Sequence, residues 1–287
     1  MSVLLATTTR SLALKNVDRL PSLSPAVNRL LGMLAKRDID MTQLGRTIAA
    51  DPSLSGHILA AANSAYFNRG SQIKSIDQAV TRLGLTKLRR IALSKSVSRI
   101  FRGMRTPDGW SMTRFQLHSA ATGAAAEILS EFLPVEDHEN AFLGGLMHDI
   151  GKVLIACGQP EQFGEIECMV AATGRSQIEF EREILGTDHA ELSGLAVAKW
   201  ELPFLLSRAV AHHHTPEAPR DFGDVPLSRI LQAADQFTNS LAISVREPAN
   251  QDLQPAQLPS IPGHEYPGTE FAARFEEEWK ILSAVCF

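Results

Sequence analysis

The chain has few cysteines, few aromatic residues and no long uninterrupted apolar run. Its 287 residues include only three cysteines, Cys157, Cys168 and Cys286. They are too widely spaced for a zinc-binding pair or a disulfide framework, so we expect a reducing, cytoplasmic environment. No stretch approaches the roughly 18 apolar residues that span a membrane, and the apolar run at residues 3–6 is too short for an export signal. We therefore expect no membrane partner.

The scarcity of aromatic residues also bears on the fold. They make up 6% of the chain, whereas hydrophobic residues together make up 44%. Aromatic and β-branched residues favour strands, while the abundant Ala and Leu are strong helix formers, so the composition predicts an all-α protein. The formal net charge is −4. This total gives no support to a protein that coats nucleic acid, and we expect no nucleic-acid partner.

The first half of the chain is expected to be helical after a flexible tail at residues 1–18. The segment PAVNRLLGMLAK (25–36) places its apolar residues on one face of a helix. In DPSLSGHILAAANSAYF (51–67), Asp51 is a good N-cap and is followed by a proline suited to the first turn. We therefore expect an N-terminal helical subdomain at residues 19–106, which ends at a TPDG loop.

A basic run lies late in this half, in TKLRRIALSKSVSRIFRGMR (86–105). Residues 82–105 contain eight Lys or Arg and no Asp or Glu. Such a run is usually a solvated face of a helix, and the alternative is a docking surface for an acidic partner or a nucleotide. The residues leave both interpretations open.

The second half is again predicted to be helical, with short interruptions near Gly or Pro, and forms a second subdomain at residues 107–245. Residues 246–268 then contain five prolines, which indicates an extended connector. A last amphipathic helix is expected at about 269–284. Residues 246–287 are thus predicted to be a proline-rich connector followed by a C-terminal helix.

Histidines and carboxylates gather in helical segments of this second half. A lone histidine on a helix is usually an ordinary hydrogen-bonded residue, but a helical bundle can direct side chains from several helices into one cavity. Imidazole and carboxylate groups are good ligands for Zn, Fe, Mn and Ni. The residues of this kind are His118, His148, Asp149, His189, His212, His213, His214 and Asp235.

The stretch GGLMHDIGKVL (144–154) carries the clearest chemistry. His148 and Asp149 stand in an apolar run, where ionisable groups are costly to bury unless something pairs with them. A carboxylate such as Asp149 could bridge two cations and so clamp a phosphoester. Lys152 lies four residues after His148, on the same helix face, where its ammonium group could meet a phosphate oxygen.

Six segments together resemble one known family, the HDOD domain, a bacterial signalling module related to HD-type metal-dependent phosphohydrolases. They are LPSLSPAV (20–27), DPSLSGHILAAANSAYF (51–67), IKSIDQAVTRLGLTKLRRIAL (73–93), FLGGLMHDIGKVLI (142–155), DHAELSGLAVAKWELP (188–203) and AHHHTPE (211–217). The resemblance covers about three quarters of the chain. It implies an all-α fold of two helical subdomains, the second similar to an HD-domain core.

The resemblance also implies a ligand set. The related HD-GYP phosphodiesterases carry metal ligands in the order His, His-Asp, His, His-His, Asp. This chain can fill that order with His118, His148, Asp149, His189, His213, His214 and Asp235. The set implies one or two divalent transition-metal ions (Fe, Mn, Zn or Ni), with Asp149 and Lys152 as the candidate catalytic residues.

The paired histidines and the segment after them differ in detail from the related enzymes. The pair His212-His213 is an alternative to His213-His214, which we prefer because HDOD sequences tend to carry His-His, one residue, then Pro. HD-GYP enzymes follow the paired histidines with a Gly-Tyr-Pro motif. This chain has EAPRDFGDVP (217–226) instead, so the loop that would embrace a cyclic dinucleotide is in question.

Three interpretations of function follow. The first is a signal-transduction or regulatory module that acts through protein partners or a bound nucleotide. It is favoured by the match in the first half, a region that HD hydrolases do not need for chemistry. The second is a metal-dependent phosphohydrolase or phosphodiesterase for a nucleotide or cyclic dinucleotide. The third is a metal held only for structure or ligand sensing.

Overall fold

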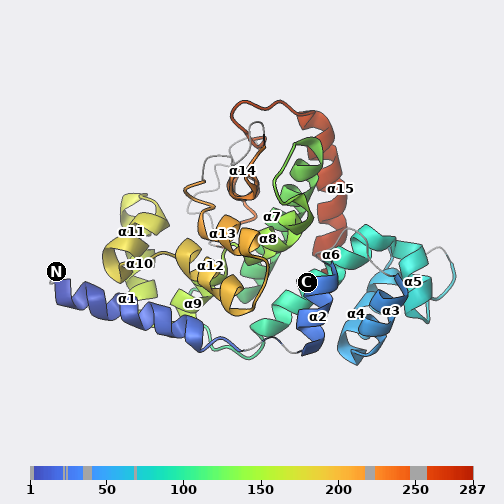
Figure 1. The fold of residues 1–287 in the computed structure, drawn as a ribbon, viewed down its shortest axis with the longest axis horizontal. Coiled ribbons are helices and arrows are strands. Elements are labelled where there is room, and N and C mark those ends of the chain that lie inside the picture. The colour runs from blue at the N-terminus through green and yellow to red at the C-terminus, as the bar shows by residue number, and fades with distance from the viewer. Residues whose placement is uncertain are drawn as a thin grey trace. The chain divides into compact units, whose positions relative to one another are not determined.

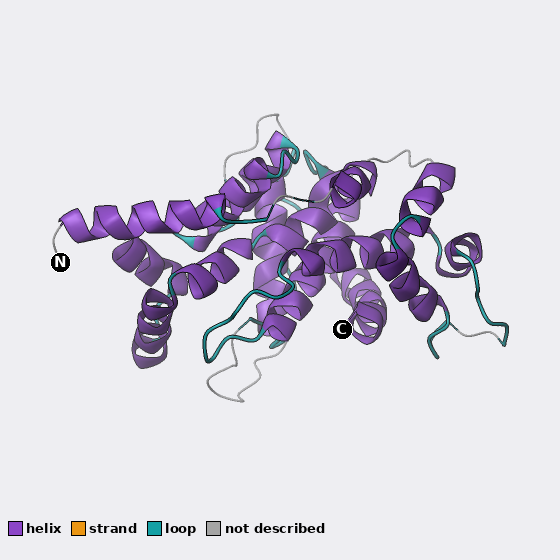
Figure 2. Cartoon of the chain, turned by 90° about the horizontal axis from the view of Figure 1, so that it is seen from below, coloured by secondary structure: helices purple, strands orange, loops and turns teal. Residues whose placement is uncertain are grey.

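The structure, a computed structural model, describes residues 3–21, 23, 25–34, 41–67, 70–216, 224–245 and 257–286. These residues form helices α1 to α15 and one 3-10 turn, with two isolated β-bridges and no strand among them. Figure 2 shows helices joined by loops throughout the described chain. The predicted all-α fold is confirmed.

The chain divides into two compact helical units. Unit 1 comprises residues 1–21 and 103–268, and unit 2 comprises residues 22–102 and 269–287. The break near residue 103 lies close to the expected TPDG loop. The first helix belongs to unit 1, which otherwise comes from the second half of the chain, and the last helix belongs to unit 2, which otherwise comes from the first half. The sequence did not predict either assignment.

Unit 2 is built from the helices of the first half and most of α15. The bounds are α2 (Pro25–Leu34), α3 (Met41–Ala49), α4 (Pro52–Ala62), α5 (Ile76–Leu83), α6 (Leu85–Ile100) and α15 (Gly268–Cys286). Asp51 caps α4 as expected, since its side chain accepts a hydrogen bond from the Leu54 amide at 3.0 Å. The same carboxylate pairs with Arg99 of α6, which ties the two helices together.

The basic run lies on α6, and part of it meets acidic residues of the chain's own last helix. Arg90 is almost fully buried, and its guanidinium lies 2.5 Å from the carboxylate of Glu278 on α15. The Lys87 ammonium lies 3.8 Å from Glu277 and 4.0 Å from Glu278. These two basic residues are therefore neither simply solvated nor presented to an outside partner.

Unit 1 contains the remaining helices (Figure 1). They are α1 (Val3–Asp18), α7 (Met112–Phe132), η1 (His138–Asn140), α8 (Ala141–Met147), α9 (Ile150–Gly158), α10 (Pro160–Thr173), α11 (Gln177–Leu185), α12 (His189–Lys199), α13 (Phe204–Ala211) and α14 (Leu227–Ser240). The long helix α7 is the centre of this unit. It packs against α8 and α14, while α12 packs against α9 and α13.

The expected flexible tail at residues 1–18 is instead helix α1, which packs on α9, α11 and α12. Ala13 and Val17 are buried. The Lys199 ammonium closes the end of α1 by donating to the Val17 carbonyl at 2.9 Å, and the Trp200 indole donates to the Pro21 carbonyl at 3.0 Å. These contacts with distant residues hold the helix in place. The apolar pattern of residues 3–18 alone therefore did not predict it.

Of the connector predicted at residues 246–268, residues 246–256 lie outside the described residues. Residues 257–267 carry no helix, and α15 begins at Gly268.

One stretch of the described chain, residues 138–158, is long and apolar enough to cross a membrane by length and composition alone. The sequence reading had found no such stretch. In the structure 83% of the apolar segment is buried inside the protein. It consists of η1, α8 and α9, so its apolar character is accounted for by the core of unit 1.

Glycines allow the helices of unit 1 to approach closely. A Cβ atom on Gly145 of α8 would lie 2.4 Å from the backbone of Gly123 in α7. A Cβ atom on Gly151 of α9 would lie 2.0 Å from the carbonyl oxygen of His189. Any larger residue at either position would push the helices apart. These two contacts hold the α8–α9 junction, which carries His148 and Asp149, against α7 and α12.

The Gly145 contact yields a stability prediction. We expect Gly145→Ala to lower the free energy of unfolding by about 1–3 kcal/mol, because backbone atoms cannot move aside as side chains can. The matched control is Gly164→Ala in α10, where an added Cβ meets nothing within 4 Å. It should raise stability by about 0.5–1 kcal/mol through helix propensity alone. Urea denaturation followed by circular dichroism measures both, and equal effects would contradict the packing account.

Candidate metal centre

All seven ligand-type side chains that the HDOD resemblance implies meet inside unit 1. They come from five places in the fold: His118 from α7, His148 and Asp149 from the α8–α9 junction, His189 from the start of α12, His213 and His214 from the segment just after α13, and Asp235 from α14. They form two groups, and within each group one ligand atom per residue lies within 4.8 Å of the others.

The first group, here called the inner cluster, consists of His118, His148, Asp149 and Asp235, all of them buried. The His118 Nε2 atom lies 3.1 Å from Asp235 Oδ1 and 3.4 Å from Asp149 Oδ2. The His148 Nε2 atom lies 3.4 Å from the same oxygen of Asp149. Two imidazoles and two carboxylates thus face one another across a few ångströms.

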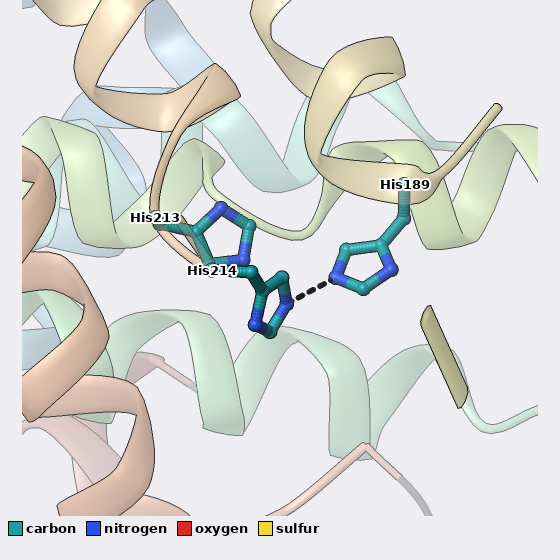
Figure 3. Close-up of side chains that lie close together, drawn as sticks. All are labelled: His189, His213 and His214. Atoms are coloured by element: carbon teal, nitrogen blue, oxygen red, sulfur yellow. Dashed lines mark hydrogen bonds between the residues drawn. The ribbon is translucent and has the colours of Figure 1, made fainter. Parts of the chain in front are cut away.

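The second group, the outer cluster, consists of His189, His213 and His214. Figure 3 shows the three rings turned toward one another, with a hydrogen bond between the Nε2 atoms of His189 and His214 at 2.8 Å. The other carboxylate oxygen of Asp149, Oδ1, lies 3.4 Å from His189 Nε2 and 3.9 Å from His213 Nε2. Asp149 therefore presents one oxygen to each cluster.

Backbone carbonyl groups fix the orientation of three of these rings. The Nδ1 atoms of His118, His148 and His213 lie within 2.7–2.8 Å of the carbonyl oxygens of Ile243, Gly145 and Val210 respectively. A carbonyl oxygen only accepts, so each Nδ1 donates and carries the proton. In its neutral form, each ring directs the Nε2 lone pair into the cluster, which is how a histidine is held for a metal.

Four atoms at the centre of this arrangement are buried and lack a hydrogen-bond partner in the described part of the chain. They are Nε2 of His118, His148 and His213, and Oδ1 of Asp149. Buried polar atoms are normally hydrogen-bonded, so several orphans facing one small volume need an explanation. Imidazole nitrogen and carboxylate oxygen are ligands of divalent transition metals, and the donor set fits such an ion.

The inner cluster strongly favours positive charge. Burial alone would raise the pKa of Asp149, but His148 and Lys152 hold it well below its usual range. Burial alone would lower the pKa of His148, but the charge of Asp149 and the close approach of the Asp149 and Asp235 carboxylates raise it to about 10. Two buried carboxylates thus draw protons onto their histidine neighbours, and a cation would take the place of those protons.

The outer cluster behaves in the opposite way. Burial and the nearby charge of His189 lower the pKa of His214 to about 3. Burial, His214 and His148 together lower the pKa of His213 well below its usual range. The rings of His213 and His214 therefore stay neutral, which is the form of imidazole that binds a metal.

A buried glutamate that the sequence reading missed supports the outer cluster. Glu181 Oε2 on α11 accepts hydrogen bonds from His189 Nδ1 at 2.6 Å and from the His189 backbone amide at 2.8 Å. This bond turns His189 Nε2 toward His214. The available signal was weak: Glu181 lies next to Phe180 and three residues before Ile184, so it shares the buried side of α11.

Lys152 connects the inner cluster to a cavity. Its ammonium donates to Asp149 Oδ2 at 2.6 Å. The same side chain lines a cavity of about 900 Å³ in unit 1, together with Trp110, Arg114, Phe163, Glu167 and Gln177 among others. An anionic compound in this cavity could reach the lysine.

The structure also separates the alternatives for the paired histidines. His213 and His214 lie in the outer cluster, whereas His212 belongs to neither group. The segment at residues 217–223, where HD-GYP enzymes carry their Gly-Tyr-Pro motif, lies outside the described residues.

Comparison with known proteins identifies the family. The family model described as the HDOD domain matches residues 20–216, which is more than half of the chain. The chain belongs to the HDOD family. The match spans the first-half helices and the second half as far as Pro216, just beyond the paired histidines, as the sequence motifs had indicated.

Three solved structures share the fold. An HDOD domain protein of unknown function from Geobacter sulfurreducens has a TM-score of 0.75 at 20% identity, with 97% of each chain covered. A candidate phosphohydrolase from Shewanella amazonensis SB2B has a TM-score of 0.73 at 23% identity, with coverage of 97% of this chain and 99% of that one. A candidate signal transduction protein from Marinobacter aquaeolei VT8 has a TM-score of 0.73 at 18% identity, with coverage of 99% and 67%.

One relative of unassigned function, from Treponema pallidum (strain Nichols), is 23% identical over 224 residues. The match covers 75% of this chain and 42% of that protein, so the chain spans less than half the length of this relative. At these identities the comparisons establish the family and the fold, and the chemistry has to be argued from the site.

The role of Glu181 can be tested without a metal. We expect Glu181→Ala to lower the free energy of unfolding by about 1–3 kcal/mol, because it leaves the buried Nδ1 and backbone amide of His189 without an acceptor. The matched control is Glu179→Ala on the same helix. Glu179 is exposed, and its carboxylate pairs with the exposed Arg175, so its loss should change stability by less than about 0.5 kcal/mol. Comparable losses in urea denaturation would contradict a specific role for Glu181.

Proposed function

We propose that this protein is an HDOD regulatory module organised around a divalent transition-metal centre in unit 1, and that it acts in signal transduction through a protein partner or a bound nucleotide. The observation that carries the proposal is the set of four buried, unpartnered ligand atoms that face one another. The regulatory part is supported by the division of the chain, since unit 2 contributes none of the ligand-type side chains.

The metal centre would be held by all seven side chains of the two clusters. The donors are imidazole nitrogens and carboxylate oxygens without thiolate, a set that suits Fe, Mn, Zn or Ni. Asp149 offers one oxygen to each cluster, which supports two ions as well as one. The carbonyl groups behind the rings and the Glu181 carboxylate would keep the ligands in place.

Metal content tests this proposal directly. Protein purified without chelator and without a metal-affinity tag should carry about one or two equivalents of a transition metal per chain by elemental analysis. Removing the metal should lower the melting temperature, because ions that bind only the folded chain stabilise it. Asp149→Asn should abolish metal retention. His212→Gln, which alters the histidine next to His213 that lies outside both clusters, should not. The absence of metal after incubation with Zn, Mn and Fe would reject the proposal.

A second candidate, a metal-dependent phosphohydrolase, is favoured by the position of Lys152 between Asp149 and the cavity. The bound metal would supply Lewis-acid polarisation of a phosphoryl oxygen and activation of water. Lys152 would attract and orient the phosphate group of a nucleotide or cyclic dinucleotide by charge. Asp149, held ionised by its neighbours, would orient the reacting groups between the clusters.

Hydrolysis assays distinguish the two candidates. If the protein is a hydrolase, the manganese-loaded chain should cleave bis(p-nitrophenyl) phosphate or a cyclic dinucleotide, and Lys152→Met should lower kcat/KM by at least about tenfold while the metal content stays unchanged. Lys280→Met, at an exposed lysine of α15, is the matched control. If the metal-loaded chain turns over none of these phosphoesters, the hydrolase candidate is rejected and the regulatory candidate stands.

A further inference from the structure

We infer that the two clusters bind cations in a fixed order, with a tight ion in the inner cluster and a weaker, exchangeable ion in the outer cluster. The inference rests on the proposed metal centre and concerns how that centre is filled. The occupancy of the outer position therefore depends on the concentration of available metal.

The inner cluster offers a cation two carboxylates of its own. Its two carboxylates carry two negative charges, which one divalent ion neutralises. Within the described residues, the Nε2 atoms of His118 and His148 have no hydrogen bond that a metal would have to break. All four residues are buried, so little water competes for the ion and electrostatic attraction is strong.

The outer cluster lacks these advantages. Its own three residues are imidazoles, and the carboxylate oxygen that faces their Nε2 atoms, Asp149 Oδ1, belongs to a group that the inner ion already shares. The Glu181 carboxylate is engaged with Nδ1 and the backbone amide of His189. An ion there must also break the hydrogen bond between His189 Nε2 and His214 Nε2. Breaking this partly buried hydrogen bond opposes binding, so the second ion is held less tightly.

Exposure separates the two positions as well. The inner cluster is buried at every residue, whereas His214 is only partly buried. An ion at the outer position can therefore exchange with solvent through one of its own ligands. The inner ion has no such ligand among its four residues.

Titration of the full-length, metal-stripped chain with Mn²⁺ tests the order. Isothermal titration calorimetry should resolve two equivalents whose dissociation constants differ by at least about tenfold. Elemental analysis after desalting should find the tight equivalent retained and the weak one lost. A single class of two equal sites, or one site only, would overturn the inference, although either result would leave the metal centre itself standing.

Variants assign each equivalent to a cluster. His214→Gln should keep the tight equivalent, with a dissociation constant within about threefold of the parent chain, and lose the weak one. Asp235→Asn should lose the tight equivalent, and His118→Gln provides a second removal of the same position if the aspartate variant does not fold. His212→Gln should retain both. Loss of both ions in His214→Gln, or a retained tight ion in Asp235→Asn and His118→Gln, would overturn the assignment. No binding by the parent chain would reject the metal centre as well.

Discussion

Two carboxylates, Asp149 and Asp235, lie in the interior of a helical unit, and most of what surrounds them follows from this placement. A buried carboxylate is tolerated only if positive charge or hydrogen-bond donors compensate for the water it loses. Lys152 and Asn239 each donate to one of the two groups. Asp149 Oδ1 and the Nε2 atoms of His118, His148 and His213 still have no hydrogen bond to any residue that the structure describes. The protein therefore holds more ligand atoms in one place than its own groups can satisfy, and a cation is the partner that fits their chemistry.

The helices hold this arrangement by close approach rather than by local sequence preference. Gly145 lets α8 meet α7, and Gly151 lets α9 meet the start of α12. The amide of Gly151 donates to the Ser193 hydroxyl at 2.8 Å, and that hydroxyl donates to the His189 carbonyl at 2.7 Å. The glycine two residues after the His-Asp pair thus has a packing reason. It brings the backbone of His189 against α9, the helix that follows the candidate ligands His148 and Asp149.

The extent to which the sequence predicted the structure differed between elements for physical reasons. The all-α fold was predictable because helix formers and 3.6-residue periodicity run through most of the chain. The seven clustered side chains were predictable only through the family motif, since spacing alone does not say that α7 and α14 meet. Helix α1 and Glu181 were not foreseen, because both depend on contacts with distant residues: Lys199 and Trp200 for the helix, and His189 for the glutamate. The pairing of Arg90 with Glu278 likewise joins α6 to a helix almost two hundred residues away.

The central claim is that the buried orphan atoms exist to bind a cation. Crystals of the chain grown with Mn²⁺, with diffraction data collected on both sides of the manganese absorption edge, test it most directly. The account predicts an anomalous peak between His118, His148, Asp149 and Asp235, with their ligand atoms turned toward it. A well-ordered cluster without any such peak, in which these side chains pair only with one another or with water, would contradict it.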